Sequence, residues 1–345
     1  MLFRDIRLIR VMWPIIDALK IDSEFRTEKS AFRALPSSPE LNEIFDQLVD
    51  KLNISRRELA RKLKVNNNSV EAWCGHGTSK QHPIPLWVLD FVISQTGDDL
   101  NIRLKVNSLI DKIRCGRTGT VQAFPRNLNP ELAALIGAHC ADGSLTRIPH
   151  RESLSWQLVD QEKESIELAS KWVKSNFEIE LKVGKLKNAN AWEIRTRKQI
   201  LPRFLVSICD MPIGEKHGIV REPRILRCPE RDNRLLTKPS KSQKKELELS
   251  FASGVMIFDG HCTITGGVPS VGIGSNSKQL LVDLLRIFKV NGIEFGNFIR
   301  HNKILTTSFR DSKKFFEMNC FQNTKKQRKL ESLLFHKHLT NYPES

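Results

Sequence analysis

The sequence predicts an α+β protein in which two pseudo-symmetric copies of an αββαββα unit follow a small all-α region. Two segments 117 residues apart share the pattern Gly-x4-Asp-Gly, and after each of them apolar and polar residues alternate as in half-buried strands. Over residues 40–97, apolar residues recur instead at the spacing of helices. Hydrophobic residues make up 40% of the 345 residues, which is enough for cores of ordinary size.

The charge of the chain points to a polyanionic partner. Lys and Arg number 55 against 39 Asp and Glu, a net charge of +16, and such an excess is typical of proteins that bind nucleic acid. No apolar run approaches the ~20 residues of a membrane helix, and the N-terminus lacks a secretory signal. The seven cysteines are scattered without a Cys-x-x-Cys pair, so neither disulfides nor structural zinc is expected. We therefore expect a cytoplasmic protein without a membrane partner.

The all-α region carries the signals of several short helices. Ser55 stands three residues before Glu58, a capping-box pattern that begins a helix. A polar turn then precedes another helix, whose Val70 and Trp73 are expected to point inward. The stretch SRRELARKLKVNNNSVEAWCGHG resembles the helix-turn-helix of the phage-repressor type. That resemblance implies that the second helix of the pair enters the major groove of DNA.

This helix-turn-helix departs from the usual pattern at its turn. Lys64 stands where glycine is usual, and Lys can take that place with some strain. The expected DNA-binding residues on the second helix are Asn67, Asn68 and Ser69. No Arg lies on that face, so strong base reading by this helix alone is not expected. An ordinary small helical bundle is the alternative.

The repeat is the most specific signal in the chain. LAALIGAHCADG matches LSFASGVMIFDG: Gly137 lies five residues before Asp142, and Gly254 lies five residues before Asp259. Strand-like SLSWQLV and VPSVGIG follow, then an amphipathic helix and a second hairpin in each copy. The offset between the copies falls from 117 to 115 because one early hairpin is two residues shorter, and at this offset Arg195 pairs with Arg310. Each copy therefore reads helix, two strands, helix, two strands, helix.

The paired motifs resemble those of the LAGLIDADG homing endonucleases in their single-chain, two-repeat form. The likeness spans roughly residues 128–320, and PIGEKHGIVREPRIL resembles the segment that commonly precedes the second motif in that family. The resemblance implies a β-saddle that lies along the DNA major groove. It also implies a monomeric, site-specific DNA endonuclease that cuts both strands of a long asymmetric target.

The two Asp residues are the expected chemical centre. Small residues such as Gly137 and Gly254 let two helices pack closely, which brings Asp142 and Asp259 together at the helix ends. Nearby carboxylates repel, and hard divalent cations relieve that repulsion, so Mg²⁺ is expected, with Mn²⁺ able to substitute. The resemblance implies that both are catalytic and metal-binding residues, one for each strand that is cut.

Other residues near the motifs have weaker assignments. The family tends to use a lysine or glutamine near the metals; Lys187 and Lys303, in the hairpins, are guesses for that group. His139 and Cys140 stand where the family has apolar or acidic residues, and both are expected to be buried in neutral form.

The DNA surface is expected on alternate polar residues of the strands, where Lys and Arg neutralise phosphates and Arg, Gln and Asn can read base edges. In the first repeat these are Arg147, Arg151, Gln157, Lys182, Lys185, Lys187, Arg195 and Arg197; in the second they are Thr263, Thr265, Ser275, Asn297, Arg300, Lys303 and Arg310. Any one of them could equally be an ordinary solvated side chain.

The expected organisation has seven parts. They are an N-terminal arm at 1–39, the helix-turn-helix domain at 40–97, a linker at 98–127, repeat 1 at 128–210, a basic inter-repeat linker at 211–245, repeat 2 at 246–320 and a basic tail at 321–345. The arm could instead be an added layer of the next domain. The inter-repeat linker holds ten Lys or Arg against four Asp or Glu, so we expect it along the DNA backbone.

Two alternatives stay open. A transcriptional regulator could keep the saddle for DNA binding without cleavage, and an intron maturase of the same family would bind intron RNA. The presence of both Asp residues argues for retained cleavage.

Overall fold

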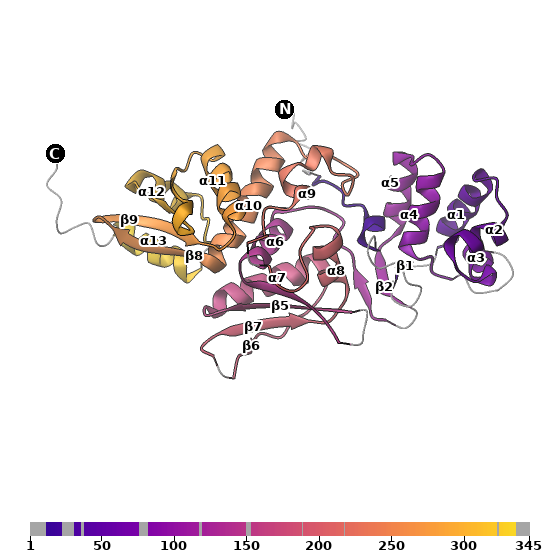
Figure 1. The fold of residues 1–345 in the computed structure, drawn as a ribbon, viewed down its shortest axis with the longest axis horizontal. Helices are drawn as coiled ribbons and strands as arrows, with labels where there is room; N and C mark the ends of the chain where they lie inside the picture. Colours follow the sequence, from indigo (N-terminus) through magenta and orange to yellow (C-terminus); the bar gives the residue numbers. More distant parts are fainter. Residues whose placement is uncertain are drawn as a thin grey trace, which may run out of the picture.

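The computed structural model is elongated, with the N-terminal helical module at one end, the first repeat in the middle and the second repeat at the other end (Figure 1). It describes residues 12–22, 31–35, 38–75, 82–116, 119–149, 153–187, 189–216, 218–322 and 324–335. Within this part of the chain, none of the helices has the length and hydrophobicity that crossing a bilayer requires.

The helical module confirms the helical spacing of the sequence. Its helices are α1 (Pro39–Lys51), α2 (Arg56–Leu63), α3 (Asn67–Trp73), α4 (Leu86–Gln95) and α5 (Leu100–Leu109). Ser55 caps α2 by accepting a hydrogen bond from the backbone N–H of Glu58. Phe45 and Trp73 pack edge to face in the core, with ring centroids 6.3 Å apart.

The turn between α2 and α3 keeps its tight form. Lys64 lies in the left-handed region, with φ 55° and ψ 42°, which a side chain enters at some cost. The N–H of Val65 bonds back to the carbonyl of Ala60. The strain expected at this lysine is therefore present, and the turn is not reshaped by it.

The expected linker at 98–127 is instead structured. It contains α5 and two of the three strands of a small antiparallel sheet: β1 (Phe32–Leu35), β2 (Lys112–Cys115) and β3 (Val121–Ala123). A short 3₁₀ helix, η1 (Ala18–Asp22), precedes this sheet. The described parts of the expected arm, 12–22 and 31–35, are thus packed layers.

The two repeats confirm the predicted αββαββα order. The first contains α6 (Pro130–Asp142), β4 (Gly143–Arg147), β5 (Leu154–Asp160), α7 (Lys163–Phe177), β6 (Gly184–Lys185), β7 (Trp192–Thr196) and α8 (Ile200–Ser207). The second contains α10 (Lys241–Asp259), β8 (Gly260–Thr265), β9 (Val268–Gly274), α11 (Lys278–Val290), β10 (Phe295–Phe298), η3 (Ile299–His301), β11 (Lys303–Thr306) and α12 (Phe309–Glu317). Each sheet is antiparallel with equivalent strand orders, β4-β5-β7-β6 and β8-β9-β11-β10. The α+β class is thereby confirmed.

The pairing of Arg195 with Arg310 is wrong. Gln157 and Gly272 are equivalent, because each lies six residues before the following helix. Gln157 is opposite Arg195 in the first sheet, and Gly272 is opposite Leu305 in the second. The counterpart of Arg195 is therefore Leu305, and Arg310 lies in α12. An alignment that keeps the offset of 115 through the second hairpin does not show that this hairpin is shorter in repeat 2.

The expected linker and tail also contain helices. The linker holds α9 (Arg224–Arg227) and η2 (Pro229–Arg231), and its last five residues already belong to α10. The tail forms α13 (Lys325–Phe335), which buries Leu330 and Leu334. The tail is therefore part of the second repeat's core.

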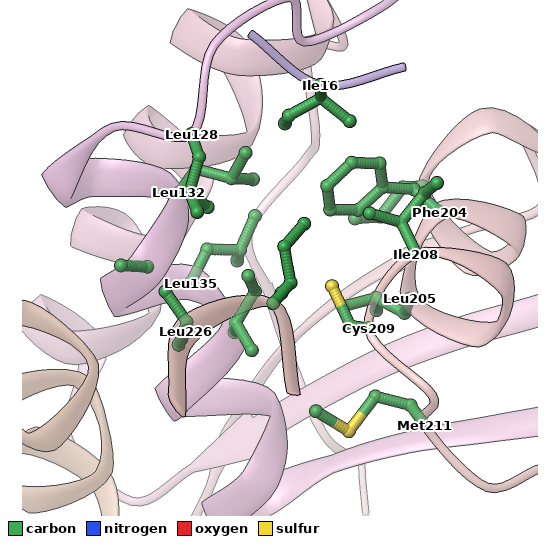
Figure 2. Close-up of a cluster of buried hydrophobic side chains, with 14 of the residues drawn as sticks. Ile16, Leu128, Leu132, Leu135, Phe204, Leu205, Ile208, Cys209, Met211 and Leu226 are labelled. Carbon is green, nitrogen blue, oxygen red and sulfur yellow. The ribbon is translucent and has the colours of Figure 1, made fainter. Parts of the chain in front are cut away.

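One core cluster joins distant parts of the chain (Figure 2). Leu128, Leu132 and Leu135 from the start of repeat 1 lie with Phe204 and residues that follow α8. The N-terminal Ile16 and the linker's Leu226 complete the cluster. Burial of these side chains fixes both the N-terminal segment and the linker onto the first repeat.

Candidate active site and nucleic-acid interface

The motif helices α6 and α10 pack backbone to backbone. A Cβ added at Gly137 would overlap the carbonyl oxygen of Phe251, and one added at Gly254 would overlap the carbonyl oxygen of Ala134. The two contacts are reciprocal, as a pseudo-twofold axis between the helices requires. Close approach at these two glycines is thus confirmed, and it places the C-terminal ends of both helices together.

Asp142 and Asp259 end these two helices and line the same cavity. The cavity has a volume of about 220 Å³ and is also lined by Lys216 and by residues just after β9. Asp142 is exposed and Asp259 is half-buried. The fold therefore places the two carboxylates in one cavity between the repeats, as expected from the sequence.

The protein opposes ionisation of this pair. Burial, and then repulsion from Asp142, raises the pKa of Asp259 to about 7. The side chain of Asp142 reaches solvent, yet the protein packed around it and the negative charge of Asp160 raise its pKa as well. A cation bound beside the two carboxylates would relieve this cost.

Asp160 is a third carboxylate near the pair that sequence reasoning missed. It ends β5 and is 9% exposed, and its Oδ1 accepts the N–H of Glu162 at 3.0 Å. Its Oδ2 is buried and has no hydrogen-bond partner among the described residues. Burial raises its pKa. An acidic residue at the end of a buried strand was the sequence signal that could have identified Asp160. The counterpart of Asp160 in repeat 2 is Ser275, so the two sides of the site differ.

Two lysines bind the ends of the motif helices. The Nζ of Lys216 donates to the carbonyls of His139 at 2.9 Å and Cys140 at 3.1 Å, and also to that of Ala141. In the second repeat, the Nζ of Lys326 donates to the carbonyls of Ile257 and Phe258, each at 2.7 Å. Helix C-termini carry partial negative charge, so an ammonium group is stabilised there.

These two lysines occupy equivalent positions. Each lies nine residues beyond the last helix of its repeat, α8 for Lys216 and α12 for Lys326. That shared spacing marks the two lysines as equivalent in sequence, but it does not indicate that they reach the helix ends. Burial lowers the pKa of both, and the nearby acidic groups oppose that effect. Of the lysines guessed from sequence, Lys187 is exposed beyond β6 and Lys303 lies over the ring of Phe298 at 6.0 Å.

His139 and Cys140 are buried, as expected. His139 is 2% exposed, and its Nδ1 accepts the indole N–H of Trp156 at 3.3 Å. Burial, and then the charge of Lys216, lowers the pKa of His139 to about 3, so the imidazole is neutral. Gly143 follows in extended conformation, and a Cβ there would overlap this imidazole. Glycine is needed at this helix exit for space, and not for a left-handed turn.

The residues present suit a cation that shares its ligands with a substrate. In the part of the chain that the structure describes, no three His, Cys, Asp or Glu side chains form a metal site. Two carboxylates, those of Asp142 and Asp259, line the cavity, and the remaining ligands would be water, carbonyls or phosphate oxygens. Mg²⁺ is commonly bound in that way, through one or two carboxylates and substrate phosphates.

Most of the expected DNA-binding residues of the repeats are exposed. Exposed side chains are those of Arg147, Lys182, Lys185, Lys187, Arg195, Arg197, Asn297, Arg300, Lys303 and Arg310. Gln157 is half-buried and donates to Glu193, which also accepts from Arg195 at 3.2 Å. Arg151 lies outside the described residues.

Helix α3, which carries the DNA-binding residues expected in the helical module, presents few polar groups. Asn68 is exposed, whereas Asn67 and Ser69 are half-buried. The Nδ2 of Asn67 donates to Glu71 at 2.6 Å. Helix α3 is therefore short, and Glu71 is its one charged residue.

Comparison with known proteins finds distant similarities of structure. No protein-family model and no curated protein sequence matches the chain. I-DmoI in complex with DNA and Mn has a TM-score of 0.37 at 16% identity, covering 55% of this chain and 96% of that one. I-WcaI bound to its DNA recognition sequence has a TM-score of 0.40 at 14% identity, covering 58% and 85%. Full-length DUF199/WhiA from Thermatoga maritima has a TM-score of 0.37 at 13% identity, covering 63% of each chain.

Proposed function

We propose that this protein binds double-stranded DNA and cleaves both strands by metal-dependent phosphodiester hydrolysis. The observation that carries the proposal is the pairing of Asp142 and Asp259 in one cavity, with a lysine at the end of each motif helix. Exposed basic side chains lie on the strands that follow each motif, and the net charge of +16 favours a polyanion.

Each group in the site has a defined part in this chemistry. Asp142 and Asp259 would hold Mg²⁺ or Mn²⁺, which would supply an activated water and stabilise the leaving oxygen. Because the pKa of Asp259 is raised to about 7, a cation bound there would compete with a proton for its carboxylate. Lys216 and Lys326 lie beside the carboxylates on opposite repeats and attract the phosphates of the two strands.

The target is expected to be asymmetric. The two sheets differ in their exposed side chains, because Arg195 corresponds to Leu305. One chain supplies both halves of the site, so a monomer suffices for cutting both strands. The basic linker adds contacts to the DNA backbone.

The decisive experiment scores binding and cutting separately. The chain is incubated with a randomised duplex library, first in EDTA to select bound sequences and then with Mg²⁺ to detect cut ends. We expect Asp142→Asn and Asp259→Asn to keep binding and to lose cutting by at least ~100-fold. Glu246→Gln, at an exposed position of α10, is the matched control and should cut as the wild type does. Intact cleavage in both Asn variants would refute the proposal.

A DNA-binding regulator without cleavage is the second candidate. It is favoured by the helical module joined to the repeats, because a helix-turn-helix binds DNA without cutting it. Specific binding with neither nicking nor cutting in Mg²⁺ or Mn²⁺ would establish it. Preference for an intron RNA over every selected duplex would instead point to a maturase.

A further inference from the structure

The helical module is joined to the first repeat by a buried segment. Residues 12–22, here called the strap, form backbone hydrogen bonds with the segments that precede and follow the first repeat in the sequence. The N–H of Ile16 donates to the carbonyl of Arg126, and that of Asp17 donates to the carbonyl of Arg234, each at 2.8 Å. Gln243, at the start of α10, donates to the carbonyl of Met12 at 3.0 Å. The strap is thus part of the repeat core.

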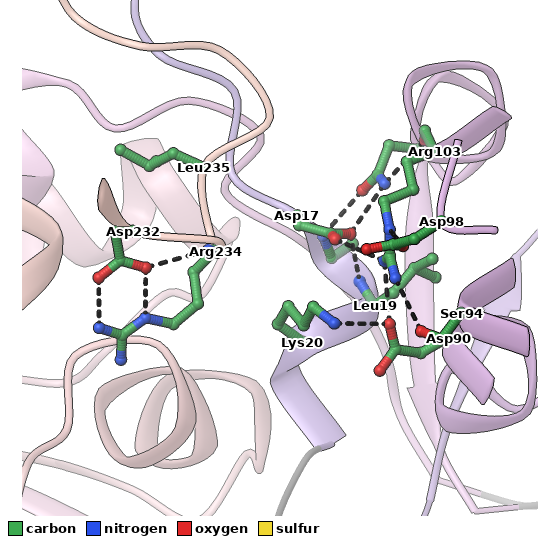
Figure 3. A network of polar contacts seen from close by, with 12 residues as sticks. Asp17, Leu19, Lys20, Asp90, Ser94, Asp98, Arg103, Asp232, Arg234 and Leu235 are labelled. Atoms are coloured by element: carbon green, nitrogen blue, oxygen red, sulfur yellow. Dashed lines mark hydrogen bonds and ion pairs between the residues drawn. The ribbon is translucent and has the colours of Figure 1, made fainter. Parts of the chain in front are cut away.

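The same strap is held by the helical module through charged groups (Figure 3). Arg103 of α5 donates to Asp17 at 2.9 Å, and Asn107 donates to the other oxygen of that carboxylate at 3.0 Å. Lys20 pairs with Asp90 of α4 at 2.8 Å. Asp17 is fully buried and Arg103 is 5% exposed. Separating a buried ion pair leaves an uncompensated charge. The contact of the strap with α4 and α5, here called the joint, therefore resists separation.

A second connection runs through the three-stranded sheet. Ala34 of β1 donates its N–H to the carbonyl of Ile84, just before α4, at 3.0 Å. On the other side, the guanidinium of Arg203 in α8 lies 5.0 Å from the ring centre of Phe32. Two separate segments therefore link the module to the first repeat, which prevents rotation about either one alone.

We propose that α3 and the sheet of the first repeat read one duplex as a single rigid unit. The target then carries two sequence blocks separated by a constant number of base pairs. In the view of Figure 1, α3 lies at the edge of its module on the side where β5, β7 and β6 also lie. This inference rests on the proposed DNA-binding function, and adds to it a fixed spacing.

Selection of the duplexes that the full chain binds, from a randomised library in EDTA, tests directly whether the two blocks have a constant spacing. Two blocks at one constant separation are expected. Two blocks at variable separations, or one block read by the repeats alone, would overturn the inference and leave the proposed DNA binding intact. A pool without enrichment would overturn the proposed function as well.

Insertions between the two blocks sharpen the test. Because B-DNA turns once in about 10 base pairs, five added base pairs move one block to the opposite face of the duplex. We expect affinity to fall at least ~10-fold, as mismatches in one block do, and ten added base pairs should not restore it, since the block is then displaced by about a full turn. Equal binding of all spacings would contradict a rigid joint.

A variant at the joint tests its rigidity without changing the residues that are expected to contact DNA. Arg103→Met breaks the ion pair with Asp17 of the strap and should reduce the penalty for five added base pairs. Lys105→Met, on the same helix, removes an exposed pair with Glu40 and should keep the full penalty. If Arg103→Met does not fold, Lys20→Met loosens the same joint at Asp90. A penalty unchanged in the folded joint variant would count against the inference.

Discussion

The ionisation of Asp259 shows how one residue couples the fold to its ligand. Its pKa is raised to about 7, chiefly by burial and next by Asp142. At neutral pH a proton and a metal cation therefore compete for the same carboxylate. Binding of the cation releases that proton, so affinity for the metal should increase with pH.

Replacing Asp259 by Asn should stabilise the protein in alkaline solution. The pKa of Asp259 in the folded protein lies above the ordinary Asp value of 3.8, so the wild-type fold loses stability as the pH rises between about 4 and 7. Asn removes this cost, and the gain should grow through that window to about 2 kcal/mol at pH 8, after allowance for solvent screening. Urea unfolding without metal at several pH values measures it, with Glu246→Gln as control. A gain that does not change with pH would contradict the assignment.

Lys326 and Lys325 are neighbours with different roles, which allows a matched comparison. Lys326→Met leaves two carbonyls at the end of α10 without their donor, and should lower the free energy of unfolding by about 1–2 kcal/mol. Lys325→Met removes only an exposed ion pair with Glu162 and should cost less than about 0.5 kcal/mol. Chemical denaturation of both variants measures their losses in the free energy of unfolding. Equal losses would mean that the helix-end contact contributes little.

Among the elements, the α6–α10 pair determines the position of the site. Because the two backbones touch at Gly137 and Gly254, any added side-chain atom there must separate the helices. That movement would also separate Asp142 from Asp259, since each lies one helical turn or so beyond its glycine. Packing and chemistry are therefore coupled in this pair.

Gly137→Ala should be strongly destabilising. In an isolated helix Ala would be favoured over Gly by about 1 kcal/mol, but here its Cβ would overlap the carbonyl of Phe251. We expect a net loss of about 3 kcal/mol, measured by urea unfolding. Gly184→Ala is the control, because the nearest atom to a Cβ there is 4.0 Å away. If the two variants have the same stability, the helices are not in backbone contact.

Over the whole molecule, the basic surface should make DNA binding strongly dependent on salt. If about ten phosphates are contacted, the logarithm of the binding constant should fall with the logarithm of salt concentration at a slope near −9. Fluorescence anisotropy with a selected duplex between about 50 and 200 mM salt measures the slope. A slope shallower than about −3 would mean that only a few phosphates are neutralised.

Local patterns account for much of the architecture. Periodicity and the repeated Gly-x4-Asp-Gly motif predicted both αββαββα units, the close helix pair and the meeting of Asp142 with Asp259, since each depends on residues near one another in the chain or related by duplication. The helices of the N-terminal module were also readable from their spacing and from the cap at Ser55.

Contacts between distant segments account for the rest. Lys216, Lys326 and Asp160 come to the site from a loop, a tail helix and a strand end, and only folding brings those three together. The strap joins residues separated by more than 200 positions, through main-chain bonds that no side-chain pattern encodes. Arg310 lies in a helix and is not the counterpart of Arg195, because the second hairpin of repeat 2 is shorter than that of repeat 1. Strand register is set by pairing across the sheet. Long-range packing and pairing, which leave little trace in local sequence, decided these features.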